Sequence, residues 1–248
     1  MIHTIWTLIF YQPLYNGLIF LVSIVPFADV GFAVILLTLI VKTILFPLTQ
    51  KSIVSQIQLK NLEGEIAKIK IDYPDKQEQA KRTFALYKEK KVSPFSGCLP
   101  LLVQLPILIA LYLVFRTGLT AAGVPALYSF VHMPVTLHTH FLGLIEMSGK
   151  SIVLALLAGI SQFIQVKLMT PPGAPRPADA KPDFKADLSR NMQTQMKYVL
   201  PVMIAFVAYQ VSAAAALYLV VNNIFAIVQE RVVRQRFKKA QPTVTVIA

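Results

Sequence analysis

The stretch from residue 198 to residue 229 constrains the fold most, because it carries no formal charge over 32 residues. As one helix, at about 1.5 Å per residue, it would be roughly 48 Å long, whereas the hydrocarbon core of a bilayer is about 30 Å thick. It is too long for one straight crossing and has the length of a tight hairpin. Further apolar runs of crossing length lie at residues 31–50, 98–115 and 151–169. The sequence therefore predicts an all-α polytopic membrane protein.

The composition agrees with this class. Hydrophobic residues make up 55% of the chain and charged residues only 15%, against about 25% charged residues in a typical soluble domain. A surface with so little charge is suited to lipid. The single cysteine, Cys98, excludes an internal disulfide framework and a cysteine metal cluster.

The basic residues predict the orientation. Lys and Arg concentrate in residues 51–97, 170–197 and 231–239, whereas residues 1–30 and 118–149 contain none. The positive-inside rule places the basic segments in the cytoplasm, and an even number of crossings must join each pair of them. Residues 198–229 must then turn back near Gln210–Ala214. The result is five crossings, with the N-terminus outside and the C-terminus inside: residues 31–50, 98–115, 151–169, 198–210 and 213–229.

The remaining segments are assigned by their composition. Residues 1–30 predict an external amphipathic helix in the outer interface, anchored by Trp6, Tyr11 and Tyr15; a sixth crossing is the alternative. Residues 51–97 predict a cytoplasmic hairpin of two charged helices, broken at Asp72–Asp75 because proline cannot continue a helix. An external loop (116–150), a proline-rich cytoplasmic loop (170–197) and a basic tail (231–248) complete the predicted core of 31–240.

Lys42 is the most informative single residue, because it lies well inside the first predicted crossing. A cation in hydrocarbon costs from about 3 to more than 10 kcal/mol. The lysine either snorkels to the inner headgroups or lines a water-filled cavity, and its stem reaches only part of the way to the headgroups. We therefore favour the cavity, with Thr38 one helical turn away on the same face.

Other polar residues fall inside the predicted crossings: Gln104, Ser161, Gln162, Gln165, Gln210, Ser212, Asn222 and Asn223. Each alone is typical of hydrogen bonding between helices; beside a buried lysine they favour a hydrophilic groove.

The predicted crossings contain no carboxylate, which disfavours a proton-driven pump. No phosphate-binding glycine loop, zinc pattern or nucleophile motif appears, so we expect neither an enzyme nor a cofactor, and His132, His138 and His140 are interpreted as interfacial residues. The basic run Arg231–Lys239 predicts contact with anionic lipid or ribosomal RNA phosphates, or a plain topology anchor.

Three segments carry a resemblance to a known family. The run Lys91–Tyr112, with its Gly-Cys-x-Pro-Leu-Leu-x-Gln-x-Pro core, is similar to the YidC-type membrane protein insertases of bacteria, as are Leu36–Ser52 and Leu217–Glu230. No large periplasmic domain is present, so the chain resembles the short form. The resemblance implies five core helices around a groove, with Lys42 where the family has an arginine. The family's Pro-Ser-Gly turn is replaced near Val211–Ala214.

The expected function is insertion of nascent membrane proteins into the bacterial inner membrane. Partners would be the nascent chains, the ribosome, a secretion channel and anionic lipids. The expected groove residues are Thr38, Lys42, Gln104, Ser161, Gln165, Tyr218 and Asn222. The hairpin, required for function in this family, would act through Ile57, Ile66, Pro74 and Tyr87. The alternatives are a small-solute transporter or channel, and a nucleic-acid binder that would use the net charge of +12.

Overall fold

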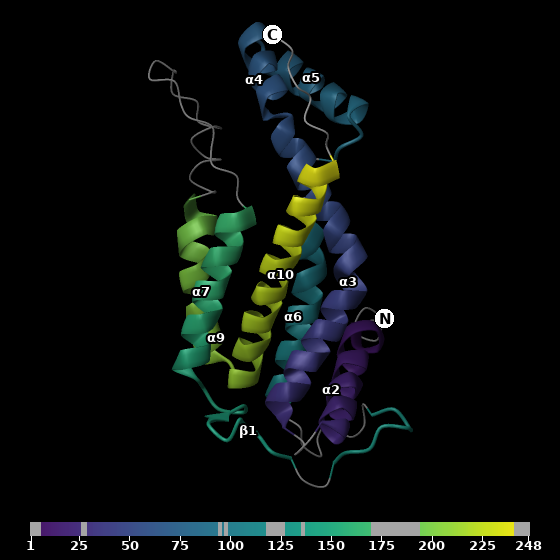
Figure 1. Cartoon of the computed structure of the whole chain (residues 1–248), viewed down its shortest axis with the longest axis vertical. Helices are drawn as coiled ribbons and strands as arrows, with labels where there is room; N and C mark the ends of the chain where they lie inside the picture. Colours follow the sequence, from purple (N-terminus) through teal and green to yellow (C-terminus); the bar gives the residue numbers. More distant parts are fainter. Residues whose placement is uncertain are drawn as a thin grey trace. The chain divides into compact units, whose positions relative to one another are not determined.

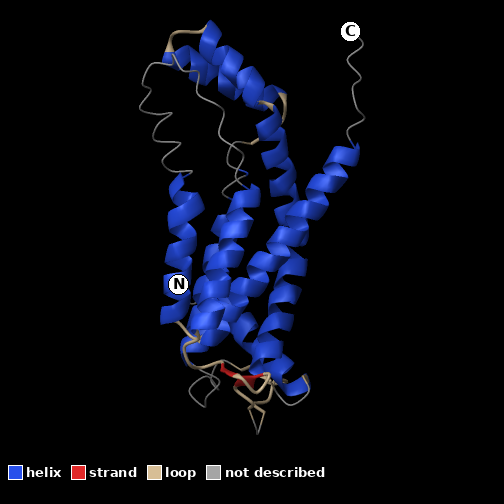
Figure 2. Ribbon diagram, turned by 60° about the vertical axis from the view of Figure 1, so that its left-hand side comes forward, coloured by secondary structure: helices blue, strands red, loops and turns tan. Residues whose placement is uncertain are grey.

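A computed structural model describes residues 6–25, 29–93, 96, 99–117, 127–134, 137–169 and 194–240. Within these ranges the chain is almost entirely helical, with one small antiparallel sheet (Figure 2). The helical elements are η1 (Thr7–Tyr11), α2 (Gln12–Ile24), α3 (Val30–Asn61), α4 (Glu63–Asp72), α5 (Lys76–Glu89), α6 (Leu99–Thr117), α7 (Ile152–Met169), η5 (Gln195–Val199), α9 (Leu200–Gln210) and α10 (Ala213–Ala240). The strands are β1 (His140–Phe141) and β2 (Ile145–Glu146).

The all-α membrane class is confirmed by the described helices. Four of them are long and apolar enough to cross a membrane, namely Thr7–Ile24, Val30–Asn61, Ile152–Met169 and Ala213–Phe237, and Leu102–Phe115 is a shorter apolar helix. The helix break at Val211–Ser212 lies inside the predicted turn, between α9 and α10. The number of crossings remains a prediction.

The chain divides into two compact units. The first comprises Met1–Ile44 and Leu105–Ile227, and the second comprises Leu45–Gln104 and Val228–Ala248. Three helices, α3, α6 and α10, contribute residues to both units (Figure 1).

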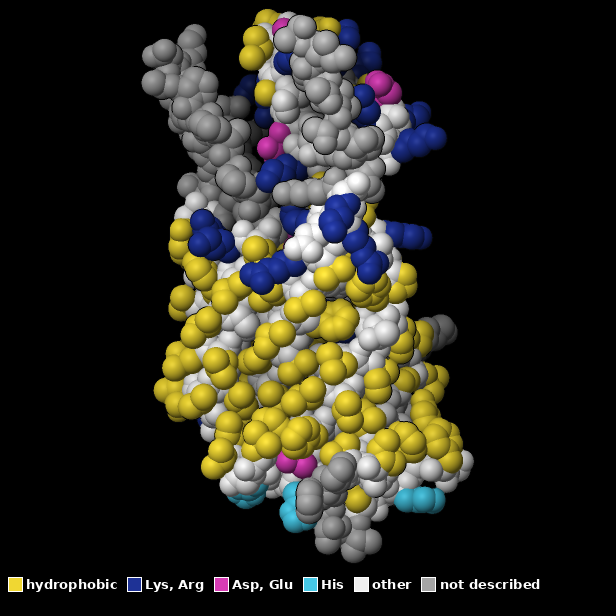
Figure 3. Space-filling view, in the orientation of Figure 1, with side chains coloured by type: hydrophobic (Ala, Val, Ile, Leu, Met, Phe, Trp, Pro, Cys, Tyr) yellow, Lys and Arg dark blue, Asp and Glu magenta, His cyan; other side chains and the backbone are white. Residues whose placement is uncertain are grey.

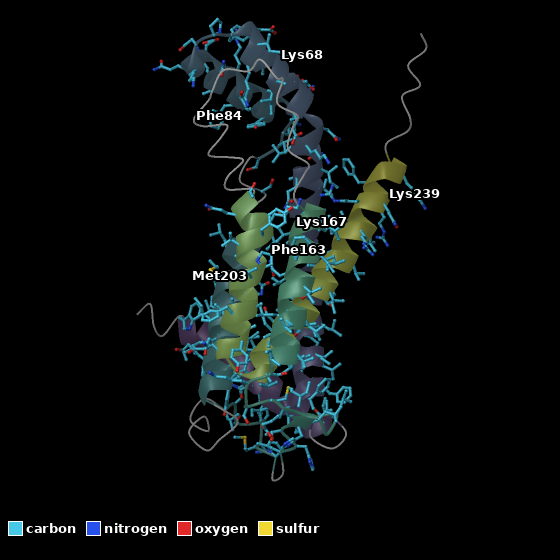
Figure 4. The ribbon with its side chains drawn as sticks, turned by 90° about the vertical axis from the view of Figure 1, so that its left-hand side faces the viewer. Lys68, Phe84, Phe163, Lys167, Met203 and Lys239 are labelled. Carbon is cyan, nitrogen blue, oxygen red and sulfur yellow. The ribbon has the colours of Figure 1, made fainter. Side chains whose placement is uncertain are left out.

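In the first unit, α7 packs closely along α9 (Figures 1 and 4). A Cβ on Gly159 would lie 2.8 Å from the Ala205 Cβ and 3.2 Å from the Pro201 carbonyl oxygen, so only glycine permits this approach. Small residues at such contacts are typical of helices that pack inside membranes. The outward sides of both helices are apolar, with Ile152 and Phe206 well exposed. Figure 3 shows such apolar side chains spread widely over the face in view.

The N-terminal helix α2 packs one face into the first unit. Tyr15, Leu18 and Ile19 are completely buried, and a Cβ on Gly17 would lie 3.2 Å from Leu37 of α3. The expectation that Tyr15 anchors at the headgroups is therefore wrong: its ring fills the protein interior because it lies on the packed side of the helix. The outward side of η1 and α2 is apolar, with Leu8, Ile9, Phe20 and Ile24 exposed.

The external loop folds against the first turns of two helices in the first unit. The Asp29 carboxylate accepts hydrogen bonds from the backbone N–H of Gly31 (2.7 Å) and Phe32 (3.3 Å), and its other oxygen accepts one from Leu142 (3.3 Å). Backbone oxygens of the loop also accept the N–H groups of Ala213 (2.7 Å) and Ala214 (3.0 Å). The loop thus satisfies donors that a helix start leaves unpaired.

The second unit contains the charged hairpin. The predicted break is confirmed, because α4 ends at Asp72 and α5 begins at Lys76. Asp75 caps α5 by accepting hydrogen bonds from Gln77 N (3.3 Å) and Glu78 N (3.1 Å), and the Arg82 guanidinium lies 4.1 Å from the Tyr73 ring centroid.

The helix that contains the first predicted crossing extends beyond it. The first crossing is predicted to end at Gln50, and α3 continues as one helix to Asn61. The change from apolar to charged residues indicates where a helix leaves the lipid. It does not by itself end the helix. Pro47 is accommodated inside α3.

Candidate functional site

Lys42 lies in the part of α3 that belongs to the first unit. Its side chain is buried, with 9% of the residue exposed, and Thr38, one turn earlier, is 2% exposed. The Thr38 hydroxyl donates to the Val34 carbonyl oxygen at 2.7 Å, which satisfies it within its own helix. A lysine that snorkelled along the outside of the bundle would be largely exposed to lipid, so the burial favours an internal position for the cation.

A polar cluster joins α7 to α10 in the same unit. The Asn223 amide nitrogen donates to the Ser161 hydroxyl (3.1 Å) and to the Ala158 carbonyl oxygen (3.4 Å). Ser161 in turn donates to Ala158 (3.0 Å), and the Asn222 amide nitrogen donates to the Asn223 amide oxygen (3.3 Å). Three polar side chains of these apolar helices, those of Ser161, Asn222 and Asn223, are therefore ordered by mutual hydrogen bonds.

Two amide oxygens near this cluster are buried without a hydrogen-bond donor from the described residues: Asn222 Oδ1 and Gln165 Oε1. Gln165 follows Ser161 by one turn of α7, and its amide nitrogen points to the Met169 sulfur at 3.7 Å. A buried acceptor that lacks a donor costs about 1–3 kcal/mol. Such groups are therefore poised to bind a donor.

The predicted groove residues are only partly brought together. Ser161 and Asn222 are linked through Asn223, and Thr38 and Lys42 share the buried side of α3. Tyr218 is 2% exposed and precedes Asn222 by one turn of α10. Gln104 is half-buried on α6 and belongs to the second unit.

Three further buried polar residues of α10 were not among the expected groove residues: Asn223, which the sequence suggested only as one of several polar residues inside the crossings, and Gln229 and Glu230, which it did not suggest. Asn223 is 1% exposed, Gln229 5% and Glu230 2%. In the second unit, Gln229 donates to the Phe46 carbonyl oxygen (3.2 Å) and the Thr49 hydroxyl (2.7 Å), and so ties α10 to α3. Glu230 accepts from Arg234. The signal was available, because Asn222 and Gln229, like Asn223 and Glu230, are seven residues apart and so share a face of one helix.

The hairpin residues occupy different environments in the second unit. Ile57, Ile66 and Tyr87 are half-buried, whereas Pro74 is exposed in the turn. Burial raises the pKa of the Tyr87 hydroxyl, and its ring meets Phe84 edge-on, with 6.4 Å between centroids. Phe84 is 62% exposed (Figure 4). The hairpin therefore presents an apolar ring among charged residues.

The described residues contain no group of three or more His, Cys, Asp or Glu side chains that could hold a metal ion. His132, His138 and His140 are exposed in the external loop, and His140 Nδ1 lies 3.1 Å from Glu146 Oε2. Cys98 lies outside the described residues.

The long apolar helices, with a lysine and hydrogen-bonded amides buried among them, define the class as an α-helical membrane protein with polar side chains inside its fold. The chain belongs to the family described as "60Kd inner membrane protein", whose model matches residues 20–240.

Named relatives extend this comparison. The chain is 36% identical over 202 residues to "Membrane protein insertase YidC" of Fusobacterium nucleatum, which covers 81% of this chain and 83% of that one. It is 31% identical over 209 residues to the protein of the same name from Francisella philomiragia, covering 84% of this chain. The chain spans only 33% of that longer relative.

A solved structure supports the fold. "Active YidC insertase crystal structure with the first transmembrane domain resolved" matches with a TM-score of 0.53 and 23% sequence identity, over 90% of this chain and 46% of that chain. The likeness concerns the arrangement of the helices.

Proposed function

We propose that the protein is a membrane protein insertase of the bacterial inner membrane, as the names of its relatives suggest. The observation that carries the proposal is the burial of Lys42, a cation inside an otherwise apolar stretch of α3. A membrane protein that needed only a stable bundle would avoid the cost of this charge.

The proposed mechanism involves no covalent chemistry. An apolar client segment with an acidic flank enters from the cytoplasm, and Lys42 attracts the flank. The hydrated groove around Lys42 is lined by Thr38, Ser161, Gln165, Tyr218 and Asn222. Polar groups that would be unsatisfied in hydrocarbon are then held by the protein during transfer.

The energy for insertion comes from the client itself. Burial of its apolar surface in lipid contributes about 25 cal/mol per Å². The membrane potential adds about 2.3 kcal/mol per 100 mV for each negative charge that moves outward. The insertase lowers the barrier and leaves the net free energy of transfer unchanged.

The test uses the full chain in proteoliposomes, with no secretion channel, and two single-span clients that differ only in a flank of two aspartates or two leucines. Lys42→Ala should slow insertion of the acidic client about tenfold, the equivalent of about 1.4 kcal/mol. Lys42→Arg should preserve it, because the charge remains.

Lys51→Ala is the matched control, because Lys51 is an exposed lysine on the same helix. Unchanged insertion of the acidic client by Lys42→Ala would remove the basis of the proposal. Equal slowing of both clients would indicate damage to the fold.

We further propose that the basic end of α10 contacts the ribosome. Arg231, Arg236 and Lys239 are exposed on this helix, and Figure 4 shows Lys239 near its end. Replacing all three with glutamine should weaken co-sedimentation with ribosomes and reduce its salt dependence, since fewer counterions are released. The control replaces Lys68, Lys70 and Lys81 of the hairpin. Unaltered co-sedimentation of the α10 variant would refute this contact.

A further inference from the structure

The polar cluster between α7 and α10 holds more hydrogen-bonding capacity than the packing of these helices requires. One serine–asparagine bond would join the two helices, and Asn223 already makes it with Ser161. The neighbouring Asn222 is 6% exposed, and its side chain makes no hydrogen bond to the described residues of α7. Its buried carbonyl oxygen finds no donor among the described residues.

The orientation of the Asn222 amide follows from its neighbours. The Asn223 amide nitrogen is directed to the backbone oxygen of Ala158, which can only accept, so the Asn223 oxygen faces Asn222. The Asn222 nitrogen must then point to that oxygen, because the reverse arrangement would oppose two acceptors. Asn222 Oδ1 is consequently the atom of this network that accepts no hydrogen bond from the described residues.

Gln165 supplies a second acceptor of the same kind. It lies one turn beyond Ser161 on α7, between Phe163 and Lys167, which Figure 4 labels. Its amide nitrogen is directed to the Met169 sulfur, a weak acceptor. Its buried oxygen, like that of Asn222, meets no donor among the described residues. The residue itself is only half-buried, so a partner reaches it with a small movement.

We propose that Asn222 and Gln165 form an acceptor site that binds neutral N–H and O–H donors of a client segment during insertion. This inference rests on the proposed insertase function. It assigns two kinds of client group to two different sites. Lys42 attracts carboxylates, whereas two amide oxygens repel carboxylates and accept hydrogen bonds. Clients whose flanks carry glutamine, asparagine, serine or threonine would depend on the acceptor site, and so would backbone N–H groups of a segment that is not yet helical.

The experiment adds two clients to the same proteoliposome assay. One carries two glutamines in the flank, and the other carries leucines interrupted by Gly-Pro, which exposes backbone donors. Asn222→Leu and Gln165→Met remove the acceptors and nearly conserve volume. Each should slow insertion of the glutamine client about fivefold, the size expected from one net hydrogen bond. The uninterrupted leucine client, whose flank carries no polar donor, gives the reference rate for each variant, and the aspartate client, whose flank Lys42 attracts, should be slowed less than the glutamine client.

Gln162→Met is the matched control, because Gln162 is also half-buried on α7 and its oxygen is not among the unsatisfied ones. It should leave all four clients unchanged. If the Gly-Pro client is slowed together with the glutamine client, the acceptor site binds backbone N–H groups as well as side chains. If only the glutamine client is slowed, the site binds side-chain donors alone. Either result supports the acceptor site.

Two results would overturn the inference. The first is a wild-type rate for the glutamine client with both variants. The second is an equal loss for all clients, which would assign these residues to packing alone. Gln165→Met keeps the test decisive if Asn222→Leu fails to fold, because among the described residues the Gln165 side chain bonds only to Met169 of its own helix. A failure here with a normal Lys42→Ala effect would leave the insertase function intact.

Discussion

Several buried or half-buried polar residues of the first unit occur in pairs one helical turn apart. Thr38 precedes Lys42 on α3, Ser161 precedes Gln165 on α7, and Tyr218 precedes Asn222 on α10. Residues four apart lie on the same face of a helix, so each helix carries a polar stripe within an apolar surface. A stripe of this kind lowers the cost of a polar group by giving it polar neighbours.

The residue types of these stripes were predictable from the sequence, because a lysine or an amide inside an apolar run is visible without a structure. Their individual roles were not. Asn222 and Asn223 are adjacent and chemically identical, and only the position of Ser161 across the helix interface shows that Asn223 is satisfied whereas the Asn222 oxygen is not.

Glu146 gives a prediction about pH at the outer loop. A hydrogen bond from the Ser148 hydroxyl lowers the pKa of the Glu146 carboxyl below its ordinary value; burial opposes this, and the Thr139 hydroxyl (2.9 Å) and nearby His140 support it. Because the folded-state pKa is depressed, ionised Glu146 stabilises the loop. This contribution is complete above the ordinary pKa of 4.5 and is lost as the pH falls through the folded-state value.

Hydrogen exchange of residues 138–149, corrected for intrinsic rates, should therefore increase on acidification from neutral pH to about 3.5, below the ordinary carboxyl range. Glu146→Gln should make the exchange less dependent on pH over this interval, since the amide does not titrate. Asp29, the other carboxylate that contacts the loop, stays in place in both proteins. Equal protection of the wild-type loop at both pH values would contradict the prediction.

At the level of elements, local signals were sufficient where a residue acts on its own neighbourhood. Pro74 ends a helix and Asp75 starts the next one, so the hairpin break was predictable from a few adjacent residues. The continuation of α3 to Asn61 could not be predicted from the change in polarity after Gln50, because that change indicates the end of a crossing and not the end of a helix. Helix length and depth in the membrane are set by different properties of the sequence.

Contacts between elements that are distant in the sequence could not be predicted, because local sequence signals describe only a residue's own neighbourhood. Asp29 and Leu142 are 113 residues apart, yet their hydrogen bond fixes the external loop to the start of α3. Gly31 takes part as well, because a Cβ there would collide with the Phe141 ring. The sequence shows an aspartate and a glycine before an apolar run, which predicts a helix start and says nothing of the loop that covers it.

For the whole molecule, the depth of α2 decides between five crossings and six. The length and apolar surface of Thr7–Ile24 are those of a crossing helix. However, Asn16, near the middle of this stretch, accepts a hydrogen bond from the backbone N–H of Tyr128 in the external loop at 2.7 Å. In a crossing helix this midpoint would lie in the centre of the bilayer, where an irregular loop exposed to lipid is not tolerated.

We therefore expect α2 to lie within the outer half of the membrane and the N-terminus to remain outside. Single cysteines introduced into a Cys98→Ser background would test this with a membrane-impermeant maleimide. Cysteines at Thr7 and Ser129 should react in intact spheroplasts, whereas one at Ala80, exposed on α5, should react only in inverted vesicles. Because Ser129 and Ala80 calibrate the two sides, labelling of position 7 only in inverted vesicles would establish the sixth crossing and reverse the expected position of the N-terminus.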